Sequence, residues 1–416
     1  MLKAFHRTPN VEDTKVLVIG AGQAGLAVSH ELTAADVPHI VLERGRVAGT
    51  WRQRWQSFCL VTPNWSGQLP GGAYSGPDPD GYMHRDSVVA HLESYAESFH
   101  APVREGIEVT SVTRAARFGF DVETSAGSLR AETVVVATGA YQKPHRPAAA
   151  AALPQELFVI DAEQYSRPDA LPPGRVLVVG SGQTGCQLSE ELHESGRDVF
   201  LACGRAPWAP RRIAGRDFFS WVVETPFMET TPMQLPNEGA RLIANVQATG
   251  HDGGHDLHYR TLQALGVTLL GHLTGVAEGR AHFARDLEES VSFGDARYLE
   301  TRELLSRHCA SRSTPMPSMP DPVPFRAQAV EHVALSDLGV VIFTSGFRPD
   351  YDRWVRIPGA FDPSGFPLHV EGQSTAAPGL FFVGVHFLRK RKSSLLYGVG
   401  EDATIVAQAI AGTRRA

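Results

Sequence analysis

The sequence has few cysteines, and their positions do not suggest a reactive centre. Its 416 residues include four, Cys59, Cys186, Cys203 and Cys309, which are widely separated. A Cys-x-x-Cys redox pair is missing, and so is the close spacing of cysteine and histidine that binds metal ions. We therefore expect four reduced thiols, a cytoplasmic protein and no metal site.

The chain also lacks an excess of positive charge and a long apolar run. Its formal net charge is -6, so the composition does not indicate the positively charged surface that binds nucleic acid. Two apolar stretches, 15–28 and 379–388, are interrupted by glycines or too short, because a membrane-spanning helix needs about 20 apolar residues. We expect neither a nucleic-acid partner nor a membrane segment, and the length suits two globular domains.

A glycine-rich loop between a strand and a helix lies near the N-terminus. Residues 15–20 form an apolar strand pattern, Gly20-Ala-Gly-Gln-Ala-Gly25 follows at once, and a helix is predicted over 23–35. The first glycine permits the tight turn, the second lets the backbone approach a pyrophosphate, and the third lets helix pack on strand. The next strand ends at Glu43, whose carboxylate would accept ribose hydroxyls. The pattern predicts a dinucleotide site.

The same pattern returns 160 residues later. An apolar strand over 175–180 leads into Gly180-Ser-Gly-Gln-Thr-Gly185, and a helix is predicted over 183–195. The next strand, 198–203, ends in Gly204-Arg205 rather than in an acid. An acid would repel a 2′-phosphate, whereas an arginine can bind it with two hydrogen bonds.

The arginines after this second strand decide which nucleotide is predicted. Arg211 and Arg212 follow Arg205 closely and would complete a clamp for the 2′-phosphate. The alternative is that all three are solvated surface residues. We predict FAD at the first glycine loop and NADPH at the second.

The remaining strands indicate how the two domains are connected. Apolar strands ending in a glycine turn lie at 132–139 and 339–346, five prolines at 313–325 indicate a connection, and a strand and helix close the chain at 379–384 and 393–410. We predict an α/β fold with two Rossmann-type domains, the second inserted into the first. Residues 1–168 and 326–416 would form the FAD-binding domain, and 169–325 the NADPH-binding domain with a helical and loop connection.

Over residues 15–410 the sequence resembles the flavin-containing monooxygenases that carry FAD and NADPH on one chain. This superfamily includes Baeyer–Villiger monooxygenases and a group of bacterial flavoproteins. Besides both glycine loops, the resemblance is carried by segments 49–55, 60–65, 69–71, 80–82, 137–139, 346–350 and 394–402. In this family the Gly-Thr-Trp segment and the asparagine after the Thr-Pro segment border the flavin, which implies that Thr50, Trp51 and Asn64 do so here.

The patterns and the resemblance together give the predicted site. The predicted cofactor-binding residues are Gly20, Gly22, Gln23, Ala24, Gly25, Glu43, Arg44, Thr50, Trp51, Thr138, Gly139, Gly180, Gly182, Gln183, Thr184, Gly185, Arg205, Arg211, Arg212, Gly384, Ser394 and Leu395. Asn64 is the candidate catalytic residue, since its neutral amide could hydrogen-bond a peroxide without titrating.

One family segment is degenerate in this chain. The family pattern Phe-x-Gly-x-x-x-His-x-x-x-Tyr/Phe, aligned on Tyr165, falls on Gln155, Leu157 and Asp161, so only the tyrosine is retained. In the family the histidine is tied to domain coupling and cofactor positioning. Its replacement by Asp161 disfavours a Baeyer–Villiger assignment.

The resemblance implies a reaction. NADPH would reduce FAD by hydride transfer, dioxygen would add to the flavin, and the C4a-(hydro)peroxyflavin would pass one oxygen atom to a small organic substrate. One alternative is an NADPH-dependent flavin reductase or oxidase that passes electrons to O2 or another acceptor. Another is a cofactor-binding protein without turnover.

Two further features are left open by the sequence. The basic run 388–392 is expected to be a solvated face, with a cofactor phosphate or an anionic substrate as the alternative ligand. A homodimer is compatible with the sequence, which contains no motif that indicates one.

Overall fold

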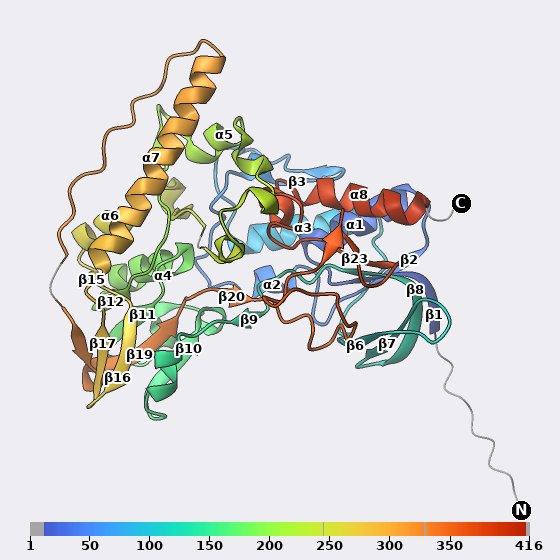
Figure 1. The fold of residues 1–416 in the computed structure, drawn as a ribbon, viewed down its shortest axis with the longest axis horizontal. Helices are drawn as coiled ribbons and strands as arrows, with labels where there is room; N and C mark the ends of the chain where they lie inside the picture. Colours follow the sequence, from blue (N-terminus) through green and yellow to red (C-terminus); the bar gives the residue numbers. More distant parts are fainter. Residues whose placement is uncertain (1–11, 244, 328–329, 413–416) are drawn as a thin grey trace, which may run out of the picture.

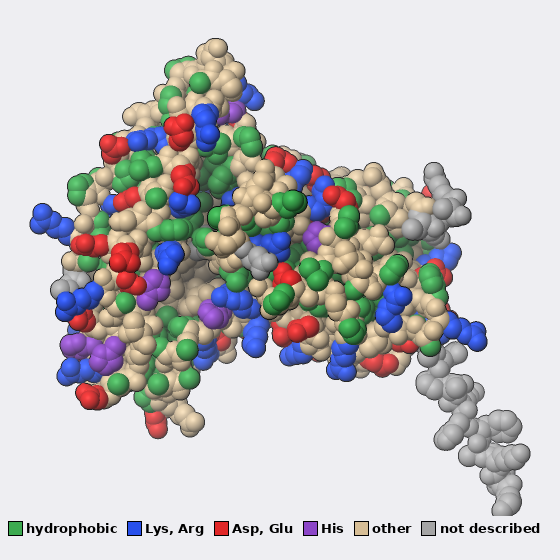
Figure 2. Space-filling model, in the orientation of Figure 1, with side chains coloured by type: hydrophobic (Ala, Val, Ile, Leu, Met, Phe, Trp, Pro, Cys, Tyr) green, Lys and Arg blue, Asp and Glu red, His purple; other side chains and the backbone are tan. Residues whose placement is uncertain are grey.

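The computed structural model describes residues 12–243, 245–327 and 330–412, which form two lobes (Figure 1). Each lobe is built around its own sheet, mixed in the first lobe and parallel in the second, and the surface is hollowed where the lobes meet (Figure 2). This arrangement confirms the predicted α/β fold with two Rossmann-type sheets.

The first sheet has nine strands and carries the N-terminal glycine loop. Its order is β21-β22-β23-β8-β1-β2-β5, with β6 and β7 attached through β8. The strands are β1 (Glu12–Ile19), β2 (His39–Leu42), β5 (Val103–Arg104), β6 (Val109–Arg114), β7 (Phe120–Thr124), β8 (Gly127–Val136), β21 (His369–Val370), β22 (Gln373–Ser374) and β23 (Leu380–Phe382). Four consecutive residues of β1, 16–19, are buried, as expected for a parallel strand covered on both faces.

The second sheet has five strands, all parallel, in the order β10-β19-β11-β12-β15. These strands are β10 (Phe158–Asp161), β11 (Arg175–Val179), β12 (Val199–Ala202), β15 (Thr268–Leu270) and β19 (Leu338–Phe343). Strand β11 lies between β19 and β12, just as β1 lies between β8 and β2 in the first sheet. The glycine loops follow β1 and β11, so both lobes contain the same strand, glycine loop and helix at the same place in the sheet.

Helices cover both sheets. They are α1 (Gln23–Ala34), α2 (Gly49–Arg52), α3 (Arg85–Ser98), α4 (Gln183–Glu194), α5 (Phe218–Val222), α6 (Tyr259–Leu265), α7 (Leu287–Ser311) and α8 (Val399–Gly412). Helix α8 lies beside α1 in the first lobe, where the Thr404 hydroxyl bonds the Glu31 carboxylate (Figure 1). The closing helix thus begins at Val399, after a short 3-10 turn, and not at residue 393 as predicted. Across the described ranges, no helix is long and apolar enough to cross a membrane.

Four small sheets complete the fold. They are β3 (Gln68–Leu69) with β4 (Gly72–Ala73), β9 (Lys143–Pro144) with β20 (Phe347–Arg348), β13 (Arg212–Ile213) with β14 (Arg216–Asp217), and β16 (Leu273–Ala277) with β17 (Arg280–Phe283) and β18 (His332–Ala334). The pair β9–β20 joins the two segments where the chain passes between the lobes.

The sheets correct the predicted domain boundaries. Strands on both sides of the second sheet in the sequence belong to the first sheet, so the insertion is confirmed. However, β10 and β19 lie in the second sheet, although the boundaries at 168/169 and 325/326 placed both in the FAD-binding domain. The sequence shows that these segments are strands. Their sheet is decided by pairing with β11, which is a tertiary contact.

Candidate functional site: two dinucleotide loops at the lobe junction

The first glycine loop has the shape that a pyrophosphate needs. Gly20 has a φ of 102°, and a Cβ on Gly25 would lie 1.8 Å from the Gly20 carbonyl oxygen. In contrast, a Cβ on Gly22 would meet no described atom within 4 Å. Helix α1 begins at Gln23, so its free N–H groups and positive dipole end face this open space. The loop therefore fits the diphosphate of a dinucleotide.

The predicted acid lies beside this loop. Glu43 is only 9% exposed, and its carboxylate accepts hydrogen bonds from the Ala21 N–H (2.8 Å) and the Gly45 N–H (2.9 Å). Arg44 and Thr138 are exposed, and Gly139 has a φ of 70° in the turn after β8. The structure thus places the acid and the Ala-Thr-Gly turn next to the glycine loop.

A chain of hydrogen bonds joins three predicted residues that are distant in sequence. The Trp51 indole N–H donates to the Gln23 side-chain oxygen (2.9 Å), and the Gln23 amide donates to the Ser394 carbonyl (3.2 Å). Gly384 also lies against α1, because its Cβ would be 2.4 Å from the Cβ of Ala24. The tertiary fold therefore gathers the N-terminal loop, the Gly-Thr-Trp segment and the C-terminal segment at one place.

The second glycine loop repeats the geometry of the first. Gly180 has a φ of 107° and lies against the backbone of Thr344. A Cβ on Gly185 would be 1.9 Å from the Gly180 carbonyl oxygen. Helix α4 begins at Gln183, next to half-buried Gly182 and Thr184.

Two residues that the sequence did not indicate support this second loop. The Gln247 amide donates to the Ser181 carbonyl (2.8 Å), and the Tyr259 hydroxyl lies 2.6 Å from the Ser181 hydroxyl. Neither residue belongs to a local motif, because both reach the loop from segments far along the chain. Only the folded structure reveals them.

Arg211 is a correction to the predicted 2′-phosphate clamp. Arg205 and Arg212 are exposed, but Arg211 is 4% exposed. Its guanidinium makes a buried ion pair with Asp217 and donates to the Val61 carbonyl (2.9 Å). Its donors are therefore used within the protein, and the predicted clamp is reduced to Arg205 and Arg212.

Asn64 is buried in a loop that its side chain helps to hold. Its side chain is 4% exposed, its amide N–H donates to the Asp78 carbonyl (2.8 Å), and its oxygen accepts from the Met83 N–H (2.6 Å). An amide that satisfies two backbone groups in this way fixes the loop containing it. These bonds give Asn64 a structural role; one amide N–H has no bond among those described here, and its part in bonding a peroxide stays a prediction.

Comparison with known proteins gives the family. Residues 17–225 match the pyridine nucleotide-disulphide oxidoreductase family. The chain belongs to this family. It is 31% identical over 392 residues to an uncharacterized CzcO-like oxidoreductase of Geobacillus kaustophilus, covering 93% of this chain and 95% of that protein.

Two further comparisons bear on the monooxygenase resemblance. The chain is 32% identical to the indole-3-pyruvate monooxygenase YUCCA1 of Oryza sativa subsp. japonica, over 53% of this chain and 54% of that protein. Its fold is similar to that of a flavin-containing monooxygenase from Stenotrophomonas maltophilia, with a TM-score of 0.67, 18% identity, and coverage of 97% and 100% of the two chains. The predicted resemblance is confirmed, and this pyridine nucleotide-disulphide oxidoreductase is a flavin enzyme that uses a nicotinamide cofactor.

The thiols of this family member are unsuited to disulfide chemistry. All four cysteines are buried and free. Burial raises the pKa of Cys59 to about 11 and raises the pKa values of Cys186 and Cys203 as well. A thiol must ionise to attack a disulfide, so these side chains are poor nucleophiles at neutral pH.

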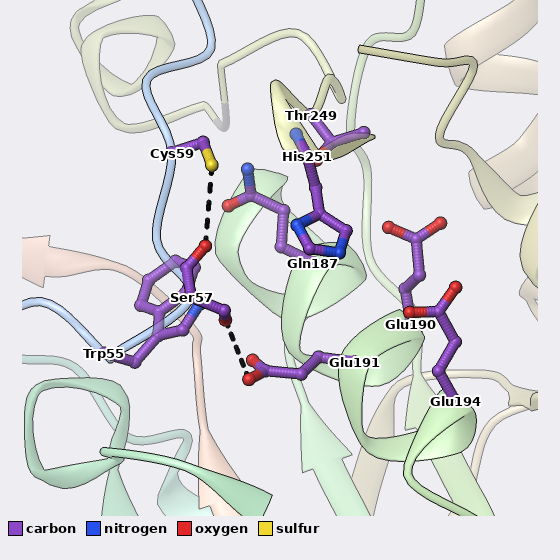
Figure 3. A pocket seen from close by; sticks show the side chains of 9 residues that line it. All are labelled: Trp55, Ser57, Cys59, Gln187, Glu190, Glu191, Glu194, Thr249 and His251. Carbon is purple, nitrogen blue, oxygen red and sulfur yellow. Dashed lines mark hydrogen bonds between the residues drawn. The ribbon is translucent and has the colours of Figure 1, made fainter. Parts of the chain in front are cut away.

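An acidic pocket lies along α4, beyond the turn that would face a dinucleotide (Figure 3). It is lined by Trp55, Ser57, Cys59, Gln187, Glu190, Glu191, Glu194, Thr249 and His251. Ser57 donates to Glu191 (2.7 Å), and Glu190 lies 2.7 Å from a ring nitrogen of His255. Because its three carboxylates would repel phosphate groups, this pocket is poorly suited to the anionic part of a dinucleotide.

The degenerate family segment forms an ion pair at the lobe junction. Asp161, at the end of β10, accepts two hydrogen bonds from Arg146 (2.8 and 2.9 Å), and Tyr165 is 2% exposed. Arg146 precedes β10 on the segment that passes between the lobes. The family's histidine position is thus occupied by a carboxylate that ties this crossover to the second sheet.

The basic run 388–392 is not a solvated face, which corrects our expectation. Arg389 pairs with Glu371 (2.6 Å) and Asp402 (3.1 Å), and both Lys390 and Lys392 pair with Glu229 and Glu401. These three cations are only 15–24% exposed. Because carboxylates already neutralise them, they are poor candidates for binding a cofactor phosphate.

This network predicts a specific acid sensitivity. Burial opposes ionisation of Glu401, but hydrogen bonds from Lys390 and Lys392 hold its pKa at about 2, below its ordinary value of 4.5. A carboxylate with a lowered folded-state pKa stabilises the protein fully above 4.5 and loses that contribution as pH falls toward 2. In urea unfolding, wild type should exceed Glu401→Gln in stability at neutral pH, with a difference that shrinks between about pH 5 and about pH 3. The same substitution at exposed Glu97 should show no such convergence.

Proposed function

We propose that this chain is an FAD-dependent, NADPH-dependent monooxygenase that inserts one oxygen atom from O2 into a small organic substrate. The observation that carries the proposal is the presence of two dinucleotide loops at one lobe junction with no ionisable thiol pair. A bound flavin would accept hydride from the nicotinamide and then react with oxygen. The chain's own part is to bind both nucleotides, hold Trp51 and the Ser394 carbonyl beside the flavin loop, and limit the access of water.

Free thiols and the nicotinamide site also support a cytoplasmic location for the proposed enzyme. The partners that this reaction requires are a small-molecule substrate and O2. An alternative within the same family is a flavin reductase or oxidase, which would pass electrons to O2 without oxygenating a substrate.

The stoichiometry of oxygen consumption distinguishes these two functions. The purified flavoprotein would be reduced with NADPH without oxygen and then mixed with oxygenated buffer and candidate substrates. A monooxygenase should show a transient absorbance band before reoxidation and, with its substrate, release much less than one peroxide per NADPH. Direct reoxidation with one peroxide per NADPH for every compound tested would favour the reductase or oxidase.

The choice of NADPH gives a prediction for Arg205. This exposed arginine follows β12, where a 2′-phosphate is expected. Arg205→Ala should weaken NADPH binding by about 1–3 kcal/mol, as for a lost hydrogen bond to a charged group, and leave NADH binding unchanged. Titration of both nucleotides against wild type and variant tests this, and equal losses for both would show that Arg205 does not recognise the 2′-phosphate.

A further inference from the structure

The carboxylate of Glu191 joins the two lobes. It projects from α4 into the acidic pocket, where the Ser57 hydroxyl donates to it at 2.7 Å from the first lobe (Figure 3). The buried hydroxyl of Tyr165, in the second lobe, lies beside the same carboxylate. Next to this contact the Gln56 N–H donates to the Ser166 carbonyl at 2.9 Å. One acidic side chain therefore fastens α4 to a segment of the first lobe.

The other two carboxylates of the pocket are placed differently. Glu190 lies 2.7 Å from a ring nitrogen of His255, which also belongs to the second lobe. Glu194 is exposed and is the last residue of α4. Burial raises the pKa of Glu191, and hydrogen bonds from the two hydroxyl groups oppose this rise, so both donors favour its ionised form. Of the three, Glu191 is the carboxylate whose bond crosses between the lobes.

Both ends of the Ser57–Glu191 bond are attached to a glycine loop. Helix α4 begins at Gln183, beside the second glycine loop, and at a rise of 1.5 Å per residue Glu191 lies about 12 Å further along the same helix. Ser57 follows Trp51 closely in the sequence, and the Trp51 indole N–H bonds a side chain at the start of α1, beside the first glycine loop. The bond thus connects the supports of the two predicted nucleotide sites by a short and ordered path.

We propose that Glu191 is a positioning residue for hydride transfer, because its bond to Ser57 fixes the placement of the nicotinamide lobe against the flavin lobe. The inference rests on the proposed function in one respect, which is that a nicotinamide on one lobe reduces a flavin on the other. Hydride transfer depends on such placement, since reacting atoms must approach to about 3–3.5 Å and a displacement of about 1 Å can cost about a hundredfold in rate. Glu191 therefore affects the rate of transfer and not the affinity for either nucleotide.

The first test separates rate from affinity by following anaerobic reduction of the flavin-loaded protein by NADPH in a stopped-flow instrument. Glu191→Leu should lower the limiting rate of flavin reduction at least about tenfold and leave the NADPH concentration that gives half this rate unchanged. Ser57→Ala breaks the same bond from the other lobe and should also lower the limiting rate. The double variant should be no slower than Glu191→Leu, because both residues act through one bond.

Two further variants and a chemical reductant serve as controls. Glu191→Gln keeps an acceptor oxygen for the Ser57 hydroxyl and should restore part of the rate. Glu194→Leu changes an exposed carboxylate of the same helix and pocket and should reduce its flavin at the wild-type rate. Dithionite should reduce the flavin equally fast in all variants, since this reductant does not depend on the placement of the lobes.

The second test measures the placement of the lobes without turnover. Nitroxide labels at Glu97→Cys and Glu289→Cys, exposed positions on α3 and α7, report one distance between the lobes, and the four native cysteines are buried. Pulsed electron spin resonance of the flavin-loaded protein should show a broader or shifted distance distribution when Glu191→Leu or Ser57→Ala is added. Adding Glu194→Leu should leave the distribution as it is in the labelled parent.

Several outcomes would overturn the inference. It is wrong if Glu191→Leu and Ser57→Ala reduce their flavin at the wild-type rate, if Glu191→Leu weakens NADPH binding and spares the limiting rate, or if the distance distribution does not change. Should Glu191→Leu fail to fold, Ser57→Ala carries both tests, because it leaves α4 intact. If NADPH does not reduce the flavin of the wild-type protein, the proposed function fails instead, so the two failures can be told apart.

Discussion

Gly22→Ala should give a folded protein that does not retain flavin, whereas Gly25→Ala should lose both flavin and stability. The two glycines lie in the same loop but have different neighbours. A Cβ on Gly22 meets no described atom, so it would intrude only on a bound pyrophosphate. A Cβ on Gly25 would be 1.8 Å from the Gly20 carbonyl oxygen, so α1 would have to move away from β1.

Flavin content after purification and the thermal unfolding midpoint measure these effects. Flavin affinity should fall by at least about tenfold for Gly22→Ala, because the alanine methyl occupies the closest approach to the diphosphate. Gly275→Ala in β16 is the control, since its Cβ also meets no described atom but lies outside both loops. Full flavin retention by Gly22→Ala would show that the pyrophosphate does not approach this loop.

Arg211→Gln should be the most destabilising of the arginine substitutions. It leaves Asp217 buried without its counter-ion, next to Tyr82, whose hydroxyl bonds the same carboxylate. It also removes the hydrogen bond to the Val61 carbonyl, which joins the second lobe to a segment of the first. Breaking one partner of a buried ion pair costs about 3–5 kcal/mol of unfolding free energy.

Arg212→Gln is the matched control for this prediction. Arg212 is exposed and its guanidinium donates to the Gly253 carbonyl at 3.2 Å, so its loss should change stability by less than about 0.5 kcal/mol. Urea unfolding compares the two variants. Titration with NADPH and NADH adds a second criterion: a selective loss of NADPH binding in Arg211→Gln would restore Arg211 to the 2′-phosphate clamp.

The sequence alone was sufficient to predict both glycine loops. Each loop is a contiguous strand, turn and helix, so its geometry depends on residues that are close in sequence. Gly20 and Gly180 take left-handed φ values, and Gly25 and Gly185 have no room for a side chain, as the spacing predicted. The end of the second strand, where Arg205 replaces an acid, could also be located by counting residues.

Only the tertiary structure decided which polar residues are available to a ligand. Arg211 and Arg212 are neighbours in sequence, yet one is buried against Asp217 and the other is exposed. The Asn64 side chain, which the sequence made a candidate for catalysis, is hydrogen-bonded to the backbone of Asp78 and Met83. The sheet to which β10 and β19 belong was likewise fixed by pairing with β11. The local pattern sets the conformation of a loop, but the availability of a charge depends on the segments that fold against it.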